Sequence, residues 1–132
     1  MKIKFRYQWY DAEKTILQYI AEADWNWRDY HAGWQPLIFN LINHQGNVHI
    51  LLDFREQTRE KMPSGLAAHF NSFGKNLSPK LSGYAVVLGF PEIDRNKLML
   101  NEDGTVSTKE GTLYFAENET EAKVIFVSLQ EK

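Results

Sequence analysis

Two short and almost continuous apolar segments constrain the fold of this chain more than any other feature. They read VHILLDF over residues 48–54 and YAVVLG over residues 84–89. Runs of this length without alternating polar positions are typical of parallel strands that helices cover closely. A segment with helical periodicity lies between them. The pair therefore predicts a right-handed βαβ unit, with both strands side by side at the centre of one sheet.

The N-terminal segment predicts a β-hairpin. Apolar and polar residues alternate over residues 2–9, which is the period of a strand with one buried and one solvent-facing side. A polar break over residues 10–13 precedes a second β-rich segment, 14–21, so the two segments are expected to pair antiparallel. Apolar residues on both faces of the second segment place it further into the sheet. The free edge of the first strand is a route to a homodimer.

Helical periodicity follows this hairpin. Asp24 is a candidate N-cap, because its carboxylate can accept the free N–H groups of a first helical turn. Spacings of three and four residues place one apolar stripe on the helix, formed by Trp27, Tyr30, Trp34, Ile38 and Leu41. Pro36 interrupts the pattern, since proline removes a backbone hydrogen bond. It predicts a kink, or two helices joined near Gln35.

The rest of the chain continues the alternation of strands and helices. Residues 63–77 predict a second helix, which a Ser-Pro pair ends. Residues 91–110 fit either a short third helix or a small hairpin. Residues 113–115 predict the last strand, and the capping-box pattern NETE opens a final helix over residues 118–129.

These elements predict an α/β fold in a single domain, residues 1–132. An N-terminal β-hairpin is followed by βα repeats, which give a mixed, mostly parallel, five-stranded sheet packed with about four helices. A chain of 132 residues is long enough to build a hydrophobic core without disulfides or a structural metal. The fold is therefore expected to form unaided.

Composition excludes several classes of function. The absence of cysteine rules out cysteine nucleophiles, thiolate metal sites and redox pairs. Lys and Arg number 15 against 17 Asp and Glu, with no basic block, so nucleic acid is not an expected partner. No stretch approaches the roughly 18 consecutive apolar residues of a membrane span, and the N-terminus lacks a signal-peptide pattern. We therefore expect a cytoplasmic protein without a membrane partner.

The element order and the segment from Leu52 to Leu66 resemble the STAS domains, the anti-sigma-factor-antagonist or SpoIIAA-like family, over essentially the whole chain. Members of that family end the central strand with Asp and open the next helix with Asp-Ser-Ser/Thr-Gly-Leu. Asp53 matches the strand-end Asp, and residues 64–66, Ser-Gly-Leu, match the last three motif positions. Pro63 stands at the phosphorylated Ser of the family, so that modification does not carry over. The resemblance implies a SpoIIAA/STAS-like fold and a protein-docking role in bacterial regulation.

Most candidate partner-binding residues follow the central strand, where ligands and partners of parallel sheets gather. They are Asp53, Arg55, Arg59, Ser64 and Gly65. Ser64 has three open roles, namely phosphorylation, anion binding and helix capping, and capping is favoured because serine is a leading N-cap residue. Trp25 is a further candidate. It lies off the buried stripe of the first helix and is expected to be exposed for a partner.

No pattern in the sequence predicts catalysis. The four histidines, His31, His44, His49 and His69, match no metal-ligand spacing and no nucleophile–base arrangement, so they are expected to be structural or surface residues. The glycines form no phosphate-binding loop. We therefore expect no catalytic residue, no metal, no cofactor and no enzymatic activity.

Two functions follow from these expectations. The first is a STAS-like interaction module that docks a partner protein through the loop after the central strand and the start of the second helix. The alternative is a binder of a small apolar or lipid-like ligand, since a superfamily that shares this architecture holds lipids. The alternative needs an enclosed apolar pocket, whereas docking needs only an exposed patch.

Overall fold

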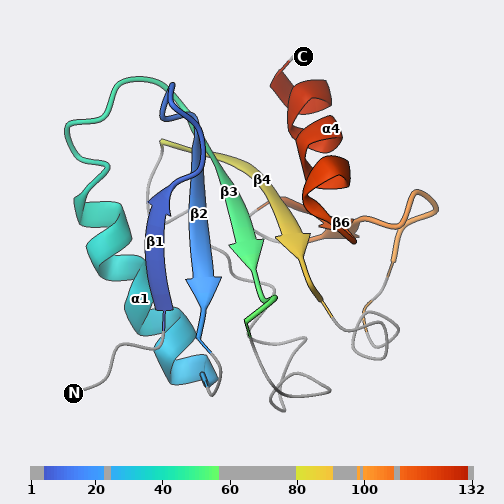
Figure 1. Cartoon of the computed structure of the whole chain (residues 1–132), viewed down its shortest axis with the longest axis horizontal. Coiled ribbons are helices and arrows are strands. Elements are labelled where there is room, and N and C mark those ends of the chain that lie inside the picture. The colour runs from blue at the N-terminus through green and yellow to red at the C-terminus, as the bar shows by residue number, and fades with distance from the viewer. Residues whose placement is uncertain are drawn as a thin grey trace.

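The structure is a computed structural model that describes residues 5–22, 25–56, 80–90, 98, 100–108 and 111–130. Its described elements are β1 (Phe5–Trp9), β2 (Ile16–Ala21), α1 (Trp27–Phe39), β3 (Val48–Asp53), β4 (Leu81–Leu88), β5 (Val106–Ser107), β6 (Thr112–Ala116) and α4 (Glu119–Gln130). The described strands form one mixed sheet in the order β1-β2-β3-β4-β6-β5, with α1 on one face and α4 on the other (Figure 1). The predicted α/β class is confirmed.

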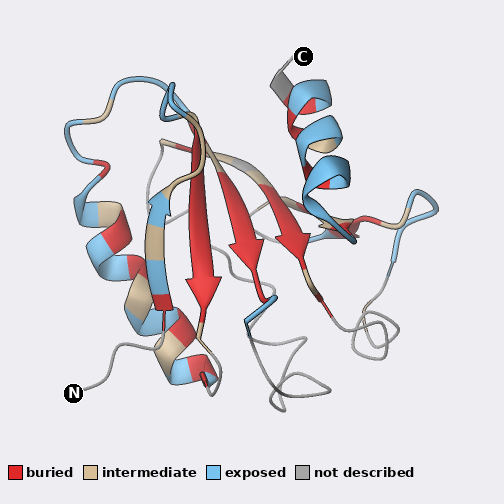
Figure 2. Ribbon diagram, viewed as in Figure 1, coloured by how far each residue is buried: buried red, intermediate tan, exposed pale blue. Residues whose placement is uncertain are grey.

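The two apolar segments form the centre of the sheet, as predicted. β3 and β4 are parallel neighbours, paired from Ile50 with Ala85 to Asp53 with Leu88. β2 pairs parallel with the other side of β3, and β6 pairs parallel with β4. Most side chains of these central strands are buried (Figure 2). The crossover helix predicted at residues 63–77 lies outside the described residues.

β1 and β2 form the predicted antiparallel hairpin, with Phe5 opposite Ala21. β2 lies between β1 and β3, which confirms its interior position. Asp11 holds the turn, because its carboxylate accepts the backbone N–H groups of Thr15 and Ile16 at 2.9 Å each. The short polar break in the sequence thus carries the side chain that fixes where β2 begins.

The C-terminal part of the sheet differs from the prediction. β5 pairs antiparallel with β6, so the described sheet has six strands rather than five. A two-residue strand is too short to show an alternating pattern. A tight turn precedes it, in which the Asn101 N–H donates to the Thr105 carbonyl at 2.8 Å and Gly104 has φ +83°. Most of the segment from 91 to 100, where the alternative third helix was predicted, lies outside the described residues, so two of the predicted helices are described.

α1 begins at an N-cap formed by Asn26. The Asn26 side chain accepts the Asp29 N–H at 3.0 Å, and the Asp29 carboxylate accepts the Asn26 N–H at 2.9 Å. The N-cap is thus Asn26 and not the predicted Asp24, which itself lies outside the described residues. Trp25 precedes the cap and packs on Tyr30, with ring centroids 6.4 Å apart, in the positions of a hydrophobic staple. Trp25 is therefore 0% exposed, and the expectation that it faces solvent is wrong.

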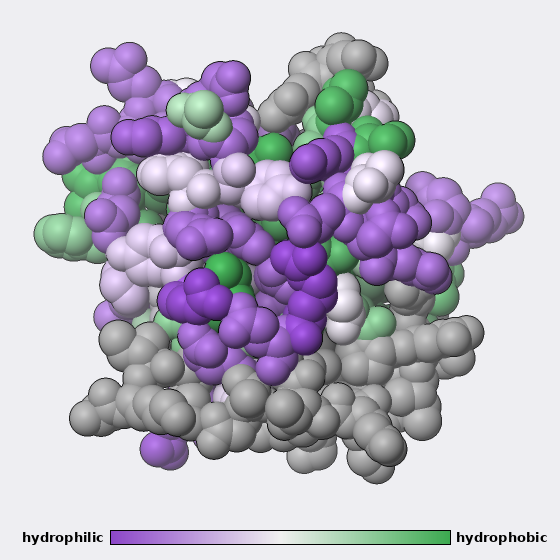
Figure 3. All heavy atoms as spheres, in the orientation of Figure 1, coloured by the Kyte–Doolittle hydropathy of each residue, from purple (hydrophilic) through white to green (hydrophobic). Residues whose placement is uncertain are grey.

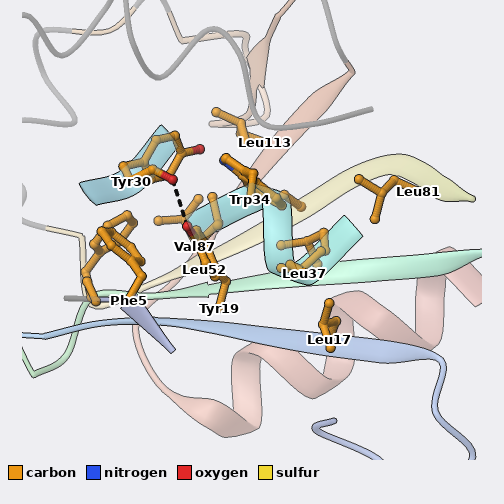
Figure 4. Close-up of a cluster of buried hydrophobic side chains, with 14 of the residues drawn as sticks. Phe5, Leu17, Tyr19, Tyr30, Trp34, Leu37, Leu52, Leu81, Val87 and Leu113 are labelled. Atoms are coloured by element: carbon orange, nitrogen blue, oxygen red, sulfur yellow. Dashed lines mark hydrogen bonds between the residues drawn. The ribbon is translucent and has the colours of Figure 1, made fainter. Parts of the chain in front are cut away.

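α1 continues through Pro36 as one helix, so the predicted division into two helices near Gln35 is wrong. Its buried side chains are those of Trp27, Tyr30, Trp34 and Leu37. The Tyr19 hydroxyl donates to the Tyr30 carbonyl at 2.7 Å (Figure 4). A Cβ atom on Gly33 would lie 2.0 Å from that hydroxyl. Glycine at position 33 is thus what allows α1 to approach the sheet this closely.

α4 confirms the predicted final helix and packs on the opposite face of the sheet, mainly over β4 and β6. Ala122, Phe126 and Leu129 supply its buried side. On this face β1 lies at the far edge of the sheet, where no described helix covers it (Figure 1). Among the described residues, no helix has the length and apolar character that crossing a bilayer requires.

Candidate functional site

Charged side chains gather at the edge of the sheet where the parallel strands end. β2, β3 and β4 end together at this edge, and the antiparallel β1 begins there. Its charged residues come from four separate parts of the chain: Arg6, Glu22, Asp53, Arg55, Glu56 and Glu119. Hydrophilic residues occupy the middle of the surface seen in Figure 3. We call these six residues the charged edge.

Asp53 is the buried anchor of the charged edge. It is the last residue of β3, and only 3% of its surface is exposed. Arg55 donates to its carboxylate from Nε at 3.0 Å and from Nη2 at 2.8 Å, and the Arg55 backbone N–H donates at 3.0 Å. Burial acts to raise the pKa of Asp53, but these hydrogen bonds and the guanidinium charge outweigh it and hold the pKa below its ordinary value. Asp53 is thus a carboxylate at neutral pH.

A chain of amide hydrogen bonds connects Asp53 to the open edge of the sheet. Gln18, in β2, donates from Nε2 to the Asp53 carboxylate at 2.8 Å. Its Oε1 accepts from Gln8 Nε2, in β1, at 2.9 Å. Gln18 is only 5% exposed, and both the oxygen and the nitrogen of its buried amide have a hydrogen-bond partner. A buried network in which the polar groups have hydrogen-bond partners holds its side chains in one geometry.

Arg55 is held from its other side by the start of α4. Its Nη1 donates to Glu119 Oε2 at 3.0 Å, and Tyr10 donates its hydroxyl to Glu119 Oε1 at 2.9 Å. Burial, followed by the hydrogen bond and charge of Glu119, raises the pKa of Tyr10 to about 12. The hydroxyl therefore stays protonated at neutral pH and remains a donor. Arg55 is fixed between two carboxylates while 41% of its side chain is exposed.

A second ion-pair cluster extends the charged edge toward β1. Arg6 donates from Nε to Glu22 at 2.9 Å, and its Nη2 pairs with Glu56. Glu56 directly follows Arg55, so the two arginines lie on one continuous surface. Both sides of the Arg6–Glu56 pair are 47% exposed. Such exposed pairs contribute little to stability, so this part of the surface can exchange partners at low cost.

Gly89 shapes the backbone behind Arg55. It has φ +78°, and a Cβ atom there would lie 2.8 Å from Arg55 Cγ and 2.9 Å from the Arg55 backbone nitrogen. The Phe54 N–H donates to the Leu88 carbonyl at 2.9 Å, which continues the pairing of β3 and β4 to this point. A side chain at position 89 would therefore displace the turn that carries Arg55.

The predicted site residues have three outcomes. Asp53 and Arg55 are brought together as the centre of the charged edge. Trp25 is buried in the aromatic core, so it cannot form part of an exposed surface. Arg59, Ser64 and Gly65 lie outside the described residues, and the roles predicted for them stay predictions.

Sequence reasoning missed the partners of Asp53 and Arg55. Gln18 had a weak signal, as a polar residue inside an apolar strand segment. Glu119, the partner of Arg55, had no signal, because it lies 64 residues further along the chain. Arg6, the partner of Glu56, had none either, because it lies 50 residues before Glu56. A charged residue on an exposed strand face or at the start of a helix does not indicate which residue of a distant segment will become its ion-pair partner.

The histidines of the described chain do not meet in one place. His44 stacks on Trp9 with ring centroids 4.9 Å apart, whereas His49 lies in β3 beside Ser82. No group of three or more potential metal ligands occurs among the described residues. Comparisons of the chain with protein-family models, with curated proteins and with solved structures found no match.

Proposed function

We propose that this chain is a non-enzymatic, STAS-like interaction module that docks a partner protein at the charged edge. The observation that carries the proposal is the fixed position of Arg55. Its guanidinium is held by Asp53 and by Glu119, yet 41% of the side chain is open to solvent. A charged group that is already ordered loses little side-chain entropy when a partner binds.

The chemistry of the charged edge favours a protein partner. Arginine is enriched at interface hot spots, because its planar guanidinium makes several directed hydrogen bonds at once. Arg55 uses three N–H groups on Asp53 and Glu119, and the remaining ones can bind a carbonyl or carboxylate of a partner. Glu119 pairs with Arg55, and Glu22 and Glu56 pair with Arg6 on the same charged edge; these carboxylates would select basic groups on the same partner.

The position of the charged edge agrees with this role. Partners and ligands of open α/β sheets gather beyond the carboxyl ends of the strands. Asp53 is a carboxylate at neutral pH and is bonded on both oxygens, so it supports Arg55 and does not donate protons. The resemblance to the STAS domains implies a docking surface at the same strand end.

The alternative function, binding of a small apolar or lipid-like ligand, has less support. A cavity between β1 and α1 is lined in part by Tyr7, Trp9, Leu17 and Leu37. Its volume is about 180 Å³. Pockets that hold drug-sized ligands measure about 300 to 1,000 Å³. This cavity is therefore too small for a lipid-like molecule, and the larger open groove beside His49 has acidic and polar side chains as well as apolar ones in its lining.

The test is affinity capture from a lysate of the native host, followed by measurement of binding with each purified candidate. Three proteins are compared: the wild type, Arg6→Glu at the charged edge, and Glu102→Lys as a control at an exposed position that is not part of that edge. We expect a partner that the wild type and the control bind equally and that Arg6→Glu binds at least about tenfold more weakly, a loss of about 1.4 kcal/mol.

Two results would contradict the proposal. One is a partner whose affinity is the same for all three proteins, which would place its docking surface elsewhere. The other is a lipid mass retained by the purified wild type in native mass spectrometry, together with the absence of any protein that distinguishes Arg6→Glu from the control. That result would favour the apolar-ligand function.

A further inference from the structure

A second open site lies at the opposite end of the sheet from the charged edge. It is a groove of about 690 Å³ between the β1–β2 turn and the last turn of α4, above the first residues of β3 and β4. The lining residues are Asp11, Glu13, Thr15, Asn47, His49, Ser82, Tyr84 and Leu129. This volume lies within the usual range of small-molecule sites, about 300 to 1,000 Å³.

The floor of the groove is a fixed pair of polar side chains. His49 Nδ1 and Ser82 Oγ are 2.7 Å apart, and the same hydroxyl oxygen accepts the Tyr84 N–H at 3.2 Å. The imidazole is half-buried, and its ring centroid lies 6.1 Å from that of Phe126 and 6.4 Å from that of Tyr84. Neighbouring strands and α4 therefore hold this floor in one arrangement, as a binding site requires.

The charged side chains among the described lining residues are acidic. Asp11 and Glu13 contribute carboxylates from the hairpin turn, and no lysine or arginine is among the lining residues that the structure describes. Burial lowers the pKa of His49, although the charge of Asp11 opposes that effect, so the imidazole is neutral at pH 7. Burial acts to raise the pKa of Asp11, but hydrogen bonds from the Thr15 hydroxyl and from the backbone of the hairpin turn outweigh it and lower the pKa, which keeps Asp11 charged. The groove thus repels anions and attracts cations.

Apolar and aromatic groups line the rest of the groove. Tyr84 presents a ring of the kind that attracts ammonium groups through its electron-rich face. Leu129 supplies an aliphatic wall from α4. A ligand with an apolar body would bury surface here, while the uncharged His49, Ser82 and Asn47 offer hydrogen bonds to its polar end.

We propose that this groove binds a small organic cation, a protonated amine on an apolar body. The carboxylates of Glu13 and Asp11 attract the ammonium group, Tyr84 and Leu129 contact the body, and the His49–Ser82 pair hydrogen-bonds polar substituents. Glu13 is the most direct test residue. It is exposed and makes no ion pair with another described residue, so its replacement leaves the fold intact.

The experiment measures binding of three probes with the same phenyl body and different charge. They are 2-phenylethylamine, 2-phenylethanol and 3-phenylpropanoate, each titrated into isotopically labelled full-length protein and followed by amide chemical shifts. We expect the amine to bind saturably with a Kd of about 1 mM or tighter, and to shift the amides of His49, Ser82 and Tyr84. The alcohol should bind at least about threefold more weakly, and the carboxylate should not bind.

Two variants complete the test. Glu13→Gln should weaken the amine about two- to fivefold, as expected for one exposed charge pair, without changing the affinity for the alcohol. The matched control, Glu102→Gln, should bind the amine as the wild type does. The proposal is overturned if the amine causes no saturable shifts, if the three probes bind alike, or if the two variants respond equally. None of these results depends on the charged edge or its partner.

Discussion

Replacement of the Arg55 side chain would measure how much its hydrogen bonds to the buried Asp53 carboxylate stabilise the fold. Arg55→Met keeps the aliphatic stem but loses the two side-chain hydrogen bonds to Asp53, of 3.0 and 2.8 Å. The Gln18 amide and the backbone N–H at position 55 stay bonded to the same carboxylate. Hydrogen bonds to charged groups contribute about 1.5 to 3 kcal/mol when both partners are buried. Because 41% of the Arg55 side chain is exposed, we expect about 2 to 3 kcal/mol for the pair together.

The dependence on pH follows from the pKa of Asp53. In the wild type this pKa lies below that of the unfolded chain, so the contribution of Asp53 to stability is present above about pH 4 and is lost as the pH falls through the folded pKa. In Arg55→Met the guanidinium no longer opposes burial, so the pKa shifts upward. The difference in unfolding free energy is therefore largest at pH 7 and shrinks below about pH 4.

The assay is urea unfolding followed by tryptophan fluorescence, since Trp25, Trp27 and Trp34 are all buried in the core. The control is Glu119→Gln, which removes one charge from an exposed pair and should therefore cost less stability than Arg55→Met. The reasoning is refuted if Arg55→Met loses less stability than Glu119→Gln at pH 7. It is also refuted if the loss is the same at pH 7 and at pH 3.5.

Three further predictions concern two glycines and a helix cap, and the midpoint of urea unfolding measures the stability change in each. Gly33→Ala should lose about 2 to 3 kcal/mol of unfolding free energy, because its Cβ would lie 2.0 Å from the Tyr19 hydroxyl. Adding Tyr19→Phe should recover part of that loss. A Gly33→Ala variant with unchanged stability would contradict this close packing. Gly89→Ala should cost at least about 1 kcal/mol more than Gly46→Ala, since both have positive φ but only position 89 meets Arg55; equal costs would refute this. Asn26→Ala should lose about 1 kcal/mol through its cap, and no loss would contradict the capping box.

The outcome at Trp25 shows why exposure could not be predicted from the helical stripe. Trp25 precedes the N-cap, so the spacing of helical residues does not apply to it. Its ring lies 5.4 Å from that of Phe54, which follows β3, and 4.9 Å from that of Trp27. Burial at this position comes from contacts between segments that are distant in sequence, and no local period reports such contacts.

The composition of the charged edge depended on tertiary structure for a similar reason. The sequence identified Asp53 and Arg55 because strand ends and the loops after them are recognisable locally. It did not identify Gln18, which reaches Asp53 only because β2 and β3 pair in a register that places Gln18 beside Leu51. The same holds for His49 and Ser82, which meet across neighbouring strands.

The order of the central strands, the N-terminal hairpin and the final helix were determined by the sequence itself. Which side chains must leave water sets the apolar runs, the alternation and the helical spacing along the sequence. These patterns are local, so they can be recognised without knowledge of the fold. The tertiary structure alone decided the partners of Asp53 and Arg55, the burial of Trp25 and the groove above His49. Those features depend on strand register and helix placement, in which a polar side chain acquires its partner from a segment brought near by the packing of the whole domain.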